Sequence, residues 1–134
     1  MAQVKALIGN IKGQPGKDGS ENQIYSTTEQ AIGTWIDGKP IYRKVFSLNK
    51  KVSEGADIST GCKLDNVDIL ISLSMYADDF WGNRWVSDIN SGNPIYLASN
   101  NYINVGAYSG SRDFYYNIHM IIAEYTKTTD TATT

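Results

Sequence analysis

Apolar side chains recur at every second position in several short runs of this chain. The clearest run spans residues 67–74, where apolar and polar residues alternate and only Leu70 is out of step. Its apolar set is Val67, Ile69, Ile71 and Leu73. Because successive side chains of a strand point to opposite faces, this pattern predicts a strand with one buried face. No segment carries a comparable helical stripe, and the nearest, residues 27–36, is interrupted by Gly33 and by β-branched residues.

Other strands are predicted by β-branched and aromatic content between turn-forming residues. They cover residues 41–48, 84–89, 94–98, 102–108 and 114–125. The last and longest run is interpreted as a strand, although its length alone would also allow a helix. The residues expected on one face of this strand are Phe114, Tyr116, Ile118, Met120 and Ile122. Turn-rich segments at 90–93 and 99–101 separate neighbouring runs, and the second indicates a hairpin. This organisation predicts an all-β fold, an antiparallel sandwich or barrel.

Composition excludes several classes of protein. The chain has 134 residues, a length typical of one domain, and a formal net charge of −2. One cysteine and one histidine exclude a disulfide framework within the chain and a multi-histidine metal site. The acidic balance argues against nucleic acid as a partner. No run of 18 apolar residues is present for membrane insertion, and residues 1–10 lack the features of a signal peptide, so synthesis in a cytoplasm is expected.

Glycine occupies every third position of the segment 13–21, at Gly13, Gly16 and Gly19. This is the collagen repeat, which requires three chains because only glycine fits at the crowded axis. A flexible Gly/Pro linker is the alternative interpretation. Three triplets span only about 28 Å, so the rest of the chain would have to hold a trimer together. Residues 127–134 are polar and Thr-rich, which predicts a disordered tail.

Candidate catalytic groups are few and lack a recognisable arrangement. Cys62 follows a loop-like stretch and His119 lies within a predicted strand, so a structural cysteine and a packed or subunit-facing histidine are expected. Carboxylate pairs such as Asp78 and Asp79 occur in any chain that contains acids, and they do not define a glycosidase. Their spacing is not that of a calcium loop. We therefore expect no catalytic residues, no metal and no cofactor.

Aromatic and polar residues are densest between two predicted strands, in residues 76–85. Aromatic rings stack on sugar rings, and Asp, Asn and Arg side chains form hydrogen bonds with hydroxyl groups. A second loop, 108–113, has a similar composition. The candidate ligand-binding residues are Tyr76, Asp78, Asp79, Trp81, Asn83, Arg84, Tyr108, Arg112 and Asp113. The alternative is that Trp81 and Trp85 anchor the core and that the charges only keep the loops soluble.

Two segments, residues 25–44 with the Asp-Gly-Lys-Pro turn and residues 124–130 at the C-terminal end, resemble parts of bacteriophage tail fibre and minor tail proteins. Residues 25–44 (YSTTEQAIGTWIDGKPIYRK) are similar to a block of those proteins in which Glu-Gln, Gly-x-Trp and Asp-Gly-Lys-Pro follow one another. Residues 124–130 (EYTKTTD) are similar to their C-terminal ending. A short collagen-like stem ahead of the block is also common in that group. Residues 49–117 have no such counterpart.

The resemblance implies a homotrimeric distal module of a virion fibre, with a jelly-roll-like β-sandwich head that contacts the host surface. It implies adhesion to host cell-surface saccharide rather than catalysis, with the rest of the tail fibre as a partner. The organisation expected is a stem at 1–24, a head at 25–126 and a tail at 127–134. Trp35 and the turn at 37–40 are expected to place the first strand of the head, and His119 to lie near subunit contacts. We expect the chain to be a distal fragment of a larger protein.

Two alternatives to a receptor-binding head are open. A structural cap would close the fibre end by trimerisation and would have no ligand. A fibre depolymerase would cleave surface glycans with paired acids, although no cleft signature is present in so short a chain.

Overall fold

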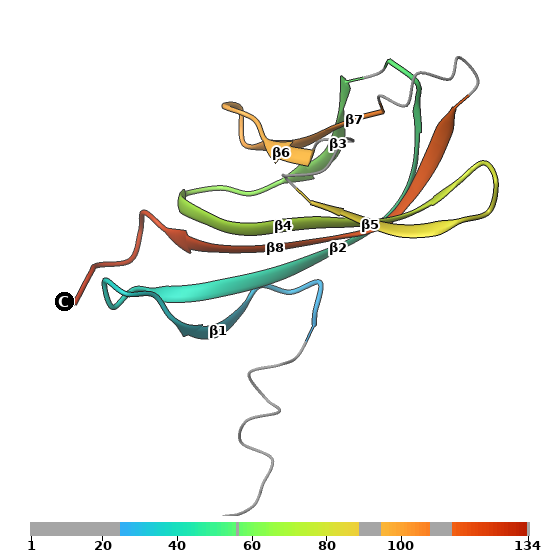
Figure 1. Cartoon of the computed structure of the whole chain (residues 1–134). Helices are drawn as coiled ribbons and strands as arrows, with labels where there is room; N and C mark the ends of the chain where they lie inside the picture. The colour runs from blue at the N-terminus through green and yellow to red at the C-terminus, as the bar shows by residue number, and fades with distance from the viewer. Residues whose placement is uncertain (1–24, 56, 89–94, 108–113, 134) are drawn as a thin grey trace, which may run out of the picture.

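The computed structural model describes residues 25–55, 57–88, 95–107 and 114–133, which contain eight strands and no helix. The strands are β1 (Gln30–Thr34), β2 (Pro40–Ser53), β3 (Asp57–Lys63), β4 (Val67–Asp79), β5 (Arg84–Asp88), β6 (Ile95–Leu97), β7 (Tyr102–Gly106) and β8 (Tyr115–Lys127). They form two antiparallel sheets with the orders β1-β2-β8-β4-β5 and β3-β7-β6. Figure 1 shows the smaller sheet above the larger. The predicted all-β architecture is confirmed, and the two sheets are consistent with a β-sandwich.

The core lies between the two sheets. The long strands β2, β8 and β4 are adjacent in the larger sheet, and each buries one of its faces. The largest buried apolar side chains are Val52, Leu73, Met75, Ile95, Ile103, Val105, Tyr116, Ile118, Ile121 and Tyr125. The pairings are nested, since β2 pairs with β8 in one sheet and β3 with β7 in the other. Burial of this apolar layer holds the sheets together.

The predicted strands at 41–48, 67–74, 84–89 and 94–98 are confirmed, and so is the hairpin at 95–102, now β6 and β7. Two strands were missed. β1 lies within residues 27–36, the segment nearest to a helical pattern, and β3 contains the loop-like Ser59 to Gly61. Both are short, and each is held in place by pairing with a strand from elsewhere in the chain. Such pairing overrides weak local preference.

One extra residue in β8 changes which of its side chains face the core. Tyr76 of β4 lies opposite Met120, and the next residue, Ala77, lies opposite Ile118. His119 is therefore the extra residue of a β-bulge, and Met120 is 37% exposed. The fully buried side chains of β8 include Tyr116, Ile118, Ile121 and Ala123. The single apolar face predicted for this run is wrong beyond His119, because a bulge shifts the alternation by one position.

A similar shift affects the start of β4. Its register with β8 is irregular on both sides of Leu70, which packs against the core although it broke the predicted alternation. Ile69 is 37% exposed instead. The prediction that Ile69 shares a buried face with Leu73 is therefore wrong, because the irregular register turns Leu70 inward.

The two segments that resemble tail fibre proteins lie side by side in the structure. Arg43 Nη2 of β2 and Glu124 Oε2 of β8 are 2.8 Å apart. The Tyr42 hydroxyl donates a 2.6 Å hydrogen bond to Asp130 Oδ2. These pairs are separated by more than 80 residues in the sequence, so the two segments form one structural unit through the pairing of β2 with β8.

Residues 128–133 also pack on this unit. The Thr128 amide donates to the Asn66 carbonyl at 2.8 Å, and the Thr133 amide donates to the Asp37 carbonyl at 2.9 Å. A Cβ added at Gly38, whose φ is +89°, would collide with the Thr133 side chain. These hydrogen bonds join the C-terminal residues to distant parts of the chain, which their composition alone does not indicate.

Candidate functional site

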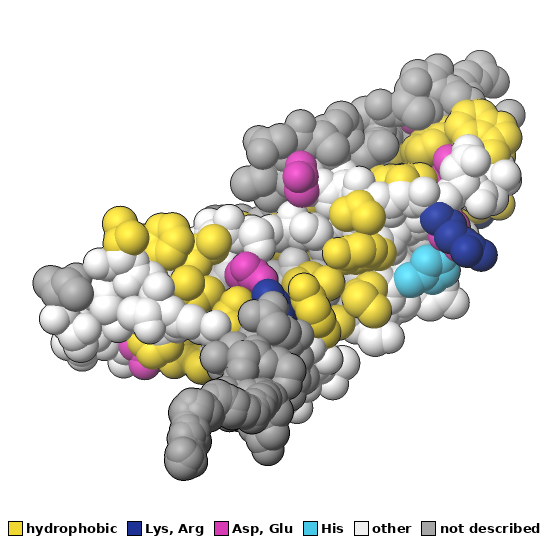
Figure 2. Space-filling view, turned by 60° about the horizontal axis from the view of Figure 1, so that its bottom comes forward, with side chains coloured by type: hydrophobic (Ala, Val, Ile, Leu, Met, Phe, Trp, Pro, Cys, Tyr) yellow, Lys and Arg dark blue, Asp and Glu magenta, His cyan; other side chains and the backbone are white. Residues whose placement is uncertain are grey.

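The candidate site lies on the face of the larger sheet that points away from the smaller one. Cross-strand pairs arrange the side chains of this face in rows. One row contains Val45, Ile122, Ser74 and Asp88, and the next contains Ser47, Met120, Tyr76 and Val86. Figure 2 shows hydrophobic side chains gathered over this face, with the single histidine, His119, beside a basic group at one side. The apolar side chains are Val45 and Ile122 in the first row and Met120, Tyr76 and Val86 in the second, so apolar surface continues across both rows.

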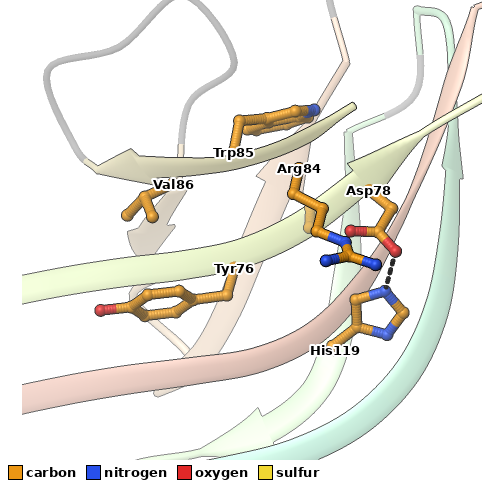
Figure 3. Close-up of a pocket in the computed structure, with 7 residues that line it drawn as sticks. Tyr76, Asp78, Arg84, Trp85, Val86 and His119 are labelled. Carbon is orange, nitrogen blue, oxygen red and sulfur yellow. Dashed lines mark hydrogen bonds and ion pairs between the residues drawn. The ribbon is translucent and has the colours of Figure 1, made fainter. Parts of the chain in front are cut away.

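Beyond these rows, a concavity of about 380 Å³ opens where β4, β5 and β8 meet. It is lined by Tyr76, Ala77, Asp78, Arg84, Trp85, Val86 and His119. Asp78 lies directly across from Arg84 in the register of β4 and β5, and its Oδ2 is 2.9 Å from His119 Nε2. In Figure 3, Tyr76, Asp78, Arg84, Val86 and His119 lie on one side of the strands. The concavity therefore combines an aromatic ring, a carboxylate, a guanidinium and an imidazole.

The bulge in β8 places His119 in this group. Without this extra residue, the side chains of β8 would alternate regularly between the two faces of the sheet. Met120 would then follow the inward-facing Ile118 directly and would have no outward-facing neighbour in the sequence. Both His119 and Met120 are exposed on the outer face. Bulges commonly redirect a side chain in this way. His119 was expected to be packed or near subunit contacts, and the sequence analysis did not include it among the ligand-binding candidates.

Two of the predicted ligand-binding residues organise the β4–β5 turn. Asp79 Oδ1 accepts 3.0 Å hydrogen bonds from the amides of Trp81 and Asn83. The Asn83 side chain in turn donates to Asp79 Oδ2 at 3.4 Å. Neither residue lines the concavity, whose carboxylate is Asp78. Their hydrogen bonds fix the turn that joins the two strands bearing Asp78 and Arg84.

The two tryptophans differ in environment. Trp81 is 64% exposed at the turn, and its ring centroid is 4.2 Å from that of Phe80. Trp85 contacts Tyr116 edge-on at 4.9 Å, and its ring points to the opposite side of β5 from Arg84 and Val86 (Figure 3). Trp85 thus packs on the core side, as the alternative interpretation held, whereas Trp81 does not.

The structure brings together three of the predicted residues, Tyr76, Asp78 and Arg84. Tyr108, Arg112 and Asp113 lie outside the described residues. Val86 and His119 complete the concavity and were missed. The alternation in 84–88 places Val86 on the same face as Arg84, a signal present in the sequence. His119 could not be found in this way, because its place depends on the bulge.

A second polar cluster lies at the other end of the sheet, around Glu29. Its carboxylate accepts hydrogen bonds from the Tyr125 hydroxyl and, at 2.9 Å, from Lys127 Nζ. Burial raises the pKa of Glu29, but these hydrogen bonds outweigh it and hold the pKa below its ordinary value. Burial and the bond to Glu29 raise the pKa of Tyr125, and the hydrogen bond to Asp130 raises that of Tyr42 to about 12. The cluster joins β1, β2 and β8 and is structural.

Within the described ranges, no group of three or more His, Cys, Asp or Glu side chains is placed to hold a metal ion. Nor does this part of the chain contain a helix long and apolar enough to cross a membrane. Cys62 is a free thiol that packs against the core. No family model, curated protein or solved structure matches the chain.

Proposed function

We propose that this chain is the receptor-binding head of a bacteriophage tail fibre, which attaches the virion to host cell-surface saccharide. The head would be a jelly-roll-like sandwich in a homotrimer, joined through a collagen-like stem at 1–24 to the rest of the fibre. The nested pairing of β2 with β8 and β3 with β7, in alternate sheets, supports the jelly-roll description. The contact between the two segments that resemble tail fibre proteins supports their architectural role.

The concavity at Asp78 is the observation that carries this proposal. Its Tyr76 ring is 38% exposed and offers an apolar surface to one side of a sugar ring. Asp78 accepts hydrogen bonds from hydroxyl groups, Arg84 donates them, and the imidazole of His119 offers a further polar group beside Asp78. Trp81 offers a further exposed ring at the nearby turn. Each site is shallow and would bind weakly, so three copies on one fibre would supply avidity.

A glycan array bearing bacterial capsule and cell-wall saccharides tests the proposal. We expect the chain to bind one class of saccharide. Asp78→Asn and Arg84→Gln should each lower binding by about 10-fold, the loss of one charged hydrogen bond. The control is Asp65→Asn, which removes a carboxylate that is exposed in the β3–β4 turn, outside the concavity. It should bind as the unaltered chain does.

The same experiment separates the two alternatives. If the folded chain binds no saccharide on the array and does not adhere to bacterial cells, it is a structural cap and the proposed adhesion is wrong. If soluble sugars are released from a bound glycan and release stops in Asp78→Asn, the chain is a depolymerase. Binding that survives both Asp78→Asn and Arg84→Gln would place the saccharide site elsewhere.

A further inference from the structure

A second concavity, of about 430 Å³, lies on the same outer sheet face next to the Asp78 site. It is lined by Tyr25, Thr27, Val45, Ser47, Tyr76, Met120 and Ile122, which we call the apolar face. Met120 and Tyr76 are each more than a third exposed. Contiguous exposed apolar surface of this kind marks interaction sites rather than ordinary surface. The face therefore has the chemistry of a contact surface for a partner.

The surroundings of the apolar face have the anatomy of a subunit interface. At one end, the ion pair of Arg43 with Glu124 follows the row of Val45 and Ile122. At the other end lie Asp78 and His119, hydrogen-bonded to each other. An apolar centre with a polar rim is typical of protein interfaces. The Arg43–Glu124 ion pair and the Asp78–His119 hydrogen bond are made within the chain, so a second surface can cover the apolar centre without breaking either of them.

The sequence before Tyr25 indicates which partner covers this face. If the Gly-x-y triplets of 13–21 form the collagen-like stem of the proposed function, three chains meet at one axis, and Glu21 is the last residue of the third triplet. Four further residues, at no more than about 3.6 Å each, limit Tyr25 to about 14 Å of chain from that point. The Tyr25 ring lies over the Arg43 guanidinium at 4.2 Å, beside Val45 on the apolar face. Tyr25, which lines the apolar face, is therefore within about 14 Å of the last triplet residue along the chain.

We infer that the apolar face is the contact surface between three copies of this chain, and that a neighbouring copy completes the saccharide site. Tyr76 links the two features, since its side chain lines both concavities. A copy seated on Met120 and Ile122 therefore lies against Tyr76 and forms a wall of the Asp78 concavity. The interface between copies is inferred from the apolar face and the triplets. The completion of the saccharide site also rests on the proposed function.

Native mass spectrometry and light scattering of the full chain test the interface. We expect the unaltered chain to have three times the mass of one copy at micromolar concentration. Met120→Asp and Ile122→Asp place a carboxylate at the centre of the face without entering the core, and should yield single copies. Ile36→Asp is the matched control, because Ile36 is 85% exposed in the β1–β2 turn and does not line the face. That variant should keep the trimeric mass.

Circular dichroism of each variant shows whether it is folded. If either Asp variant is unfolded, Ser74→Cys in a Cys62→Ser background replaces it, since Ser74 lies beside Ile122 on the same face. A short bismaleimide should then join copies of the folded chain. A monomeric mass for the unaltered chain overturns the inferred interface. So does a trimer that survives both Asp variants, or a cysteine at position 74 that does not cross-link.

Titration with the saccharide identified on the array tests the completed site. Met120 does not line the Asp78 concavity, so a folded single-copy Met120→Asp chain keeps every saccharide contact of its own. We expect its affinity per site to fall by at least about 10-fold. An unchanged affinity per site overturns the completed site but leaves the interface and the adhesion in place. An absence of any saccharide binding contradicts the proposed function, while the mass measurement still decides the interface.

Discussion

The Glu29 carboxylate shows how one charged side chain joins distant parts of the sequence. It lies just before β1, yet its two partners, Tyr125 and Lys127, are on β8. Their hydrogen bonds hold its pKa below the ordinary value of 4.5 despite partial burial. A carboxylate with a lowered pKa stabilises the fold above its unfolded-state pKa, and this contribution is lost as pH falls through the folded-state pKa.

Glu29→Gln should therefore destabilise the chain by about 1 kcal/mol at pH 7, a value reduced from that of a buried charged hydrogen bond because Glu29 is partly exposed. The difference from the unaltered chain should shrink as pH falls below about 4.5. Urea unfolding between pH 3 and pH 7, at one protein concentration, measures it. A difference that stays constant over this range would contradict the role of the charge.

Asp79 has a different task, since its oxygens serve the turn that follows β4. Three donors converge on it, the amides of Trp81 and Asn83 and the Asn83 side chain. Side chains of Asp and Asn commonly stabilise turns in this way. The residue was predicted to bind ligand, and in the structure its side chain forms the hydrogen bonds that stabilise the loop.

Asp79→Ala should lower the free energy of unfolding by about 1 kcal/mol, the usual cost of losing such local hydrogen bonds. Asp79→Asn keeps one carbonyl oxygen and should cost less. Urea unfolding of both variants measures the difference. Unchanged stability in Asp79→Ala, combined with lost saccharide binding, would return Asp79 to the list of ligand contacts.

At the scale of elements, the bulge in β8 decides both the core and the site. Before His119 the side chains of even-numbered residues are buried, and from Ile121 to Tyr125 those of odd-numbered residues are buried. Both halves of the strand therefore face the same core, but the alternate residues that point into it shift by one position at the bulge. The change also brings His119 next to Asp78.

Deletion of His119 should leave the fold intact, because Ile118 and Met120 then occupy adjacent positions opposite the adjacent residues Ala77 and Tyr76. We expect a loss of about 1–2 kcal/mol, in the range of ordinary substitutions. Deletion of Asn117 is the matched control, since it turns the buried Tyr116 or Ile118 outward and should abolish folding. Near-ultraviolet circular dichroism and thermal unfolding distinguish the two chains. Equal damage from both deletions would contradict the bulge.

At the scale of the whole molecule, the C-terminal residues close the end of the larger sheet. Asp130 accepts a hydrogen bond from Tyr42, and Thr133 is bonded to Asp37. Thr133 also fills the space over Gly38, whose positive φ disfavours any side chain. The turn before β2 is thus shaped by residues almost 100 positions further along the chain.

Truncation after Lys127 should cost about 1–3 kcal/mol, from the loss of these hydrogen bonds. In the full chain, Gly38→Ala should lower the free energy of unfolding by about 2–3 kcal/mol, because the positive φ strains the alanine backbone and its Cβ collides with Thr133. In the truncated chain only the backbone strain remains, and the loss should be about 1–2 kcal/mol. A double-mutant cycle from urea unfolding measures this coupling. An additive cycle would show that Thr133 does not pack on Gly38.

The elements that the sequence predicted well are those in which local pattern and tertiary environment agree. β2, β5 and the β6–β7 hairpin have β-branched and aromatic content between clear turns, and each formed where expected. β3 was missed because Ser59, Thr60 and Gly61 carry a weak local preference. At the site, Tyr76, Asp78 and Arg84 were found from composition alone, whereas His119 depends on a bulge.

The sequence by itself determined the all-β class, the main strands and the dense polar and aromatic segment between β4 and β5, because these follow from local side-chain alternation and turn chemistry. Only the tertiary structure decided which face Met120 and His119 occupy, and that Thr128, Asp130 and Thr133 form hydrogen bonds with Asn66, Tyr42 and Asp37. The reason is physical: alternation is a property of neighbouring residues, whereas a bulge or a closing contact depends on strands brought together from distant parts of the chain.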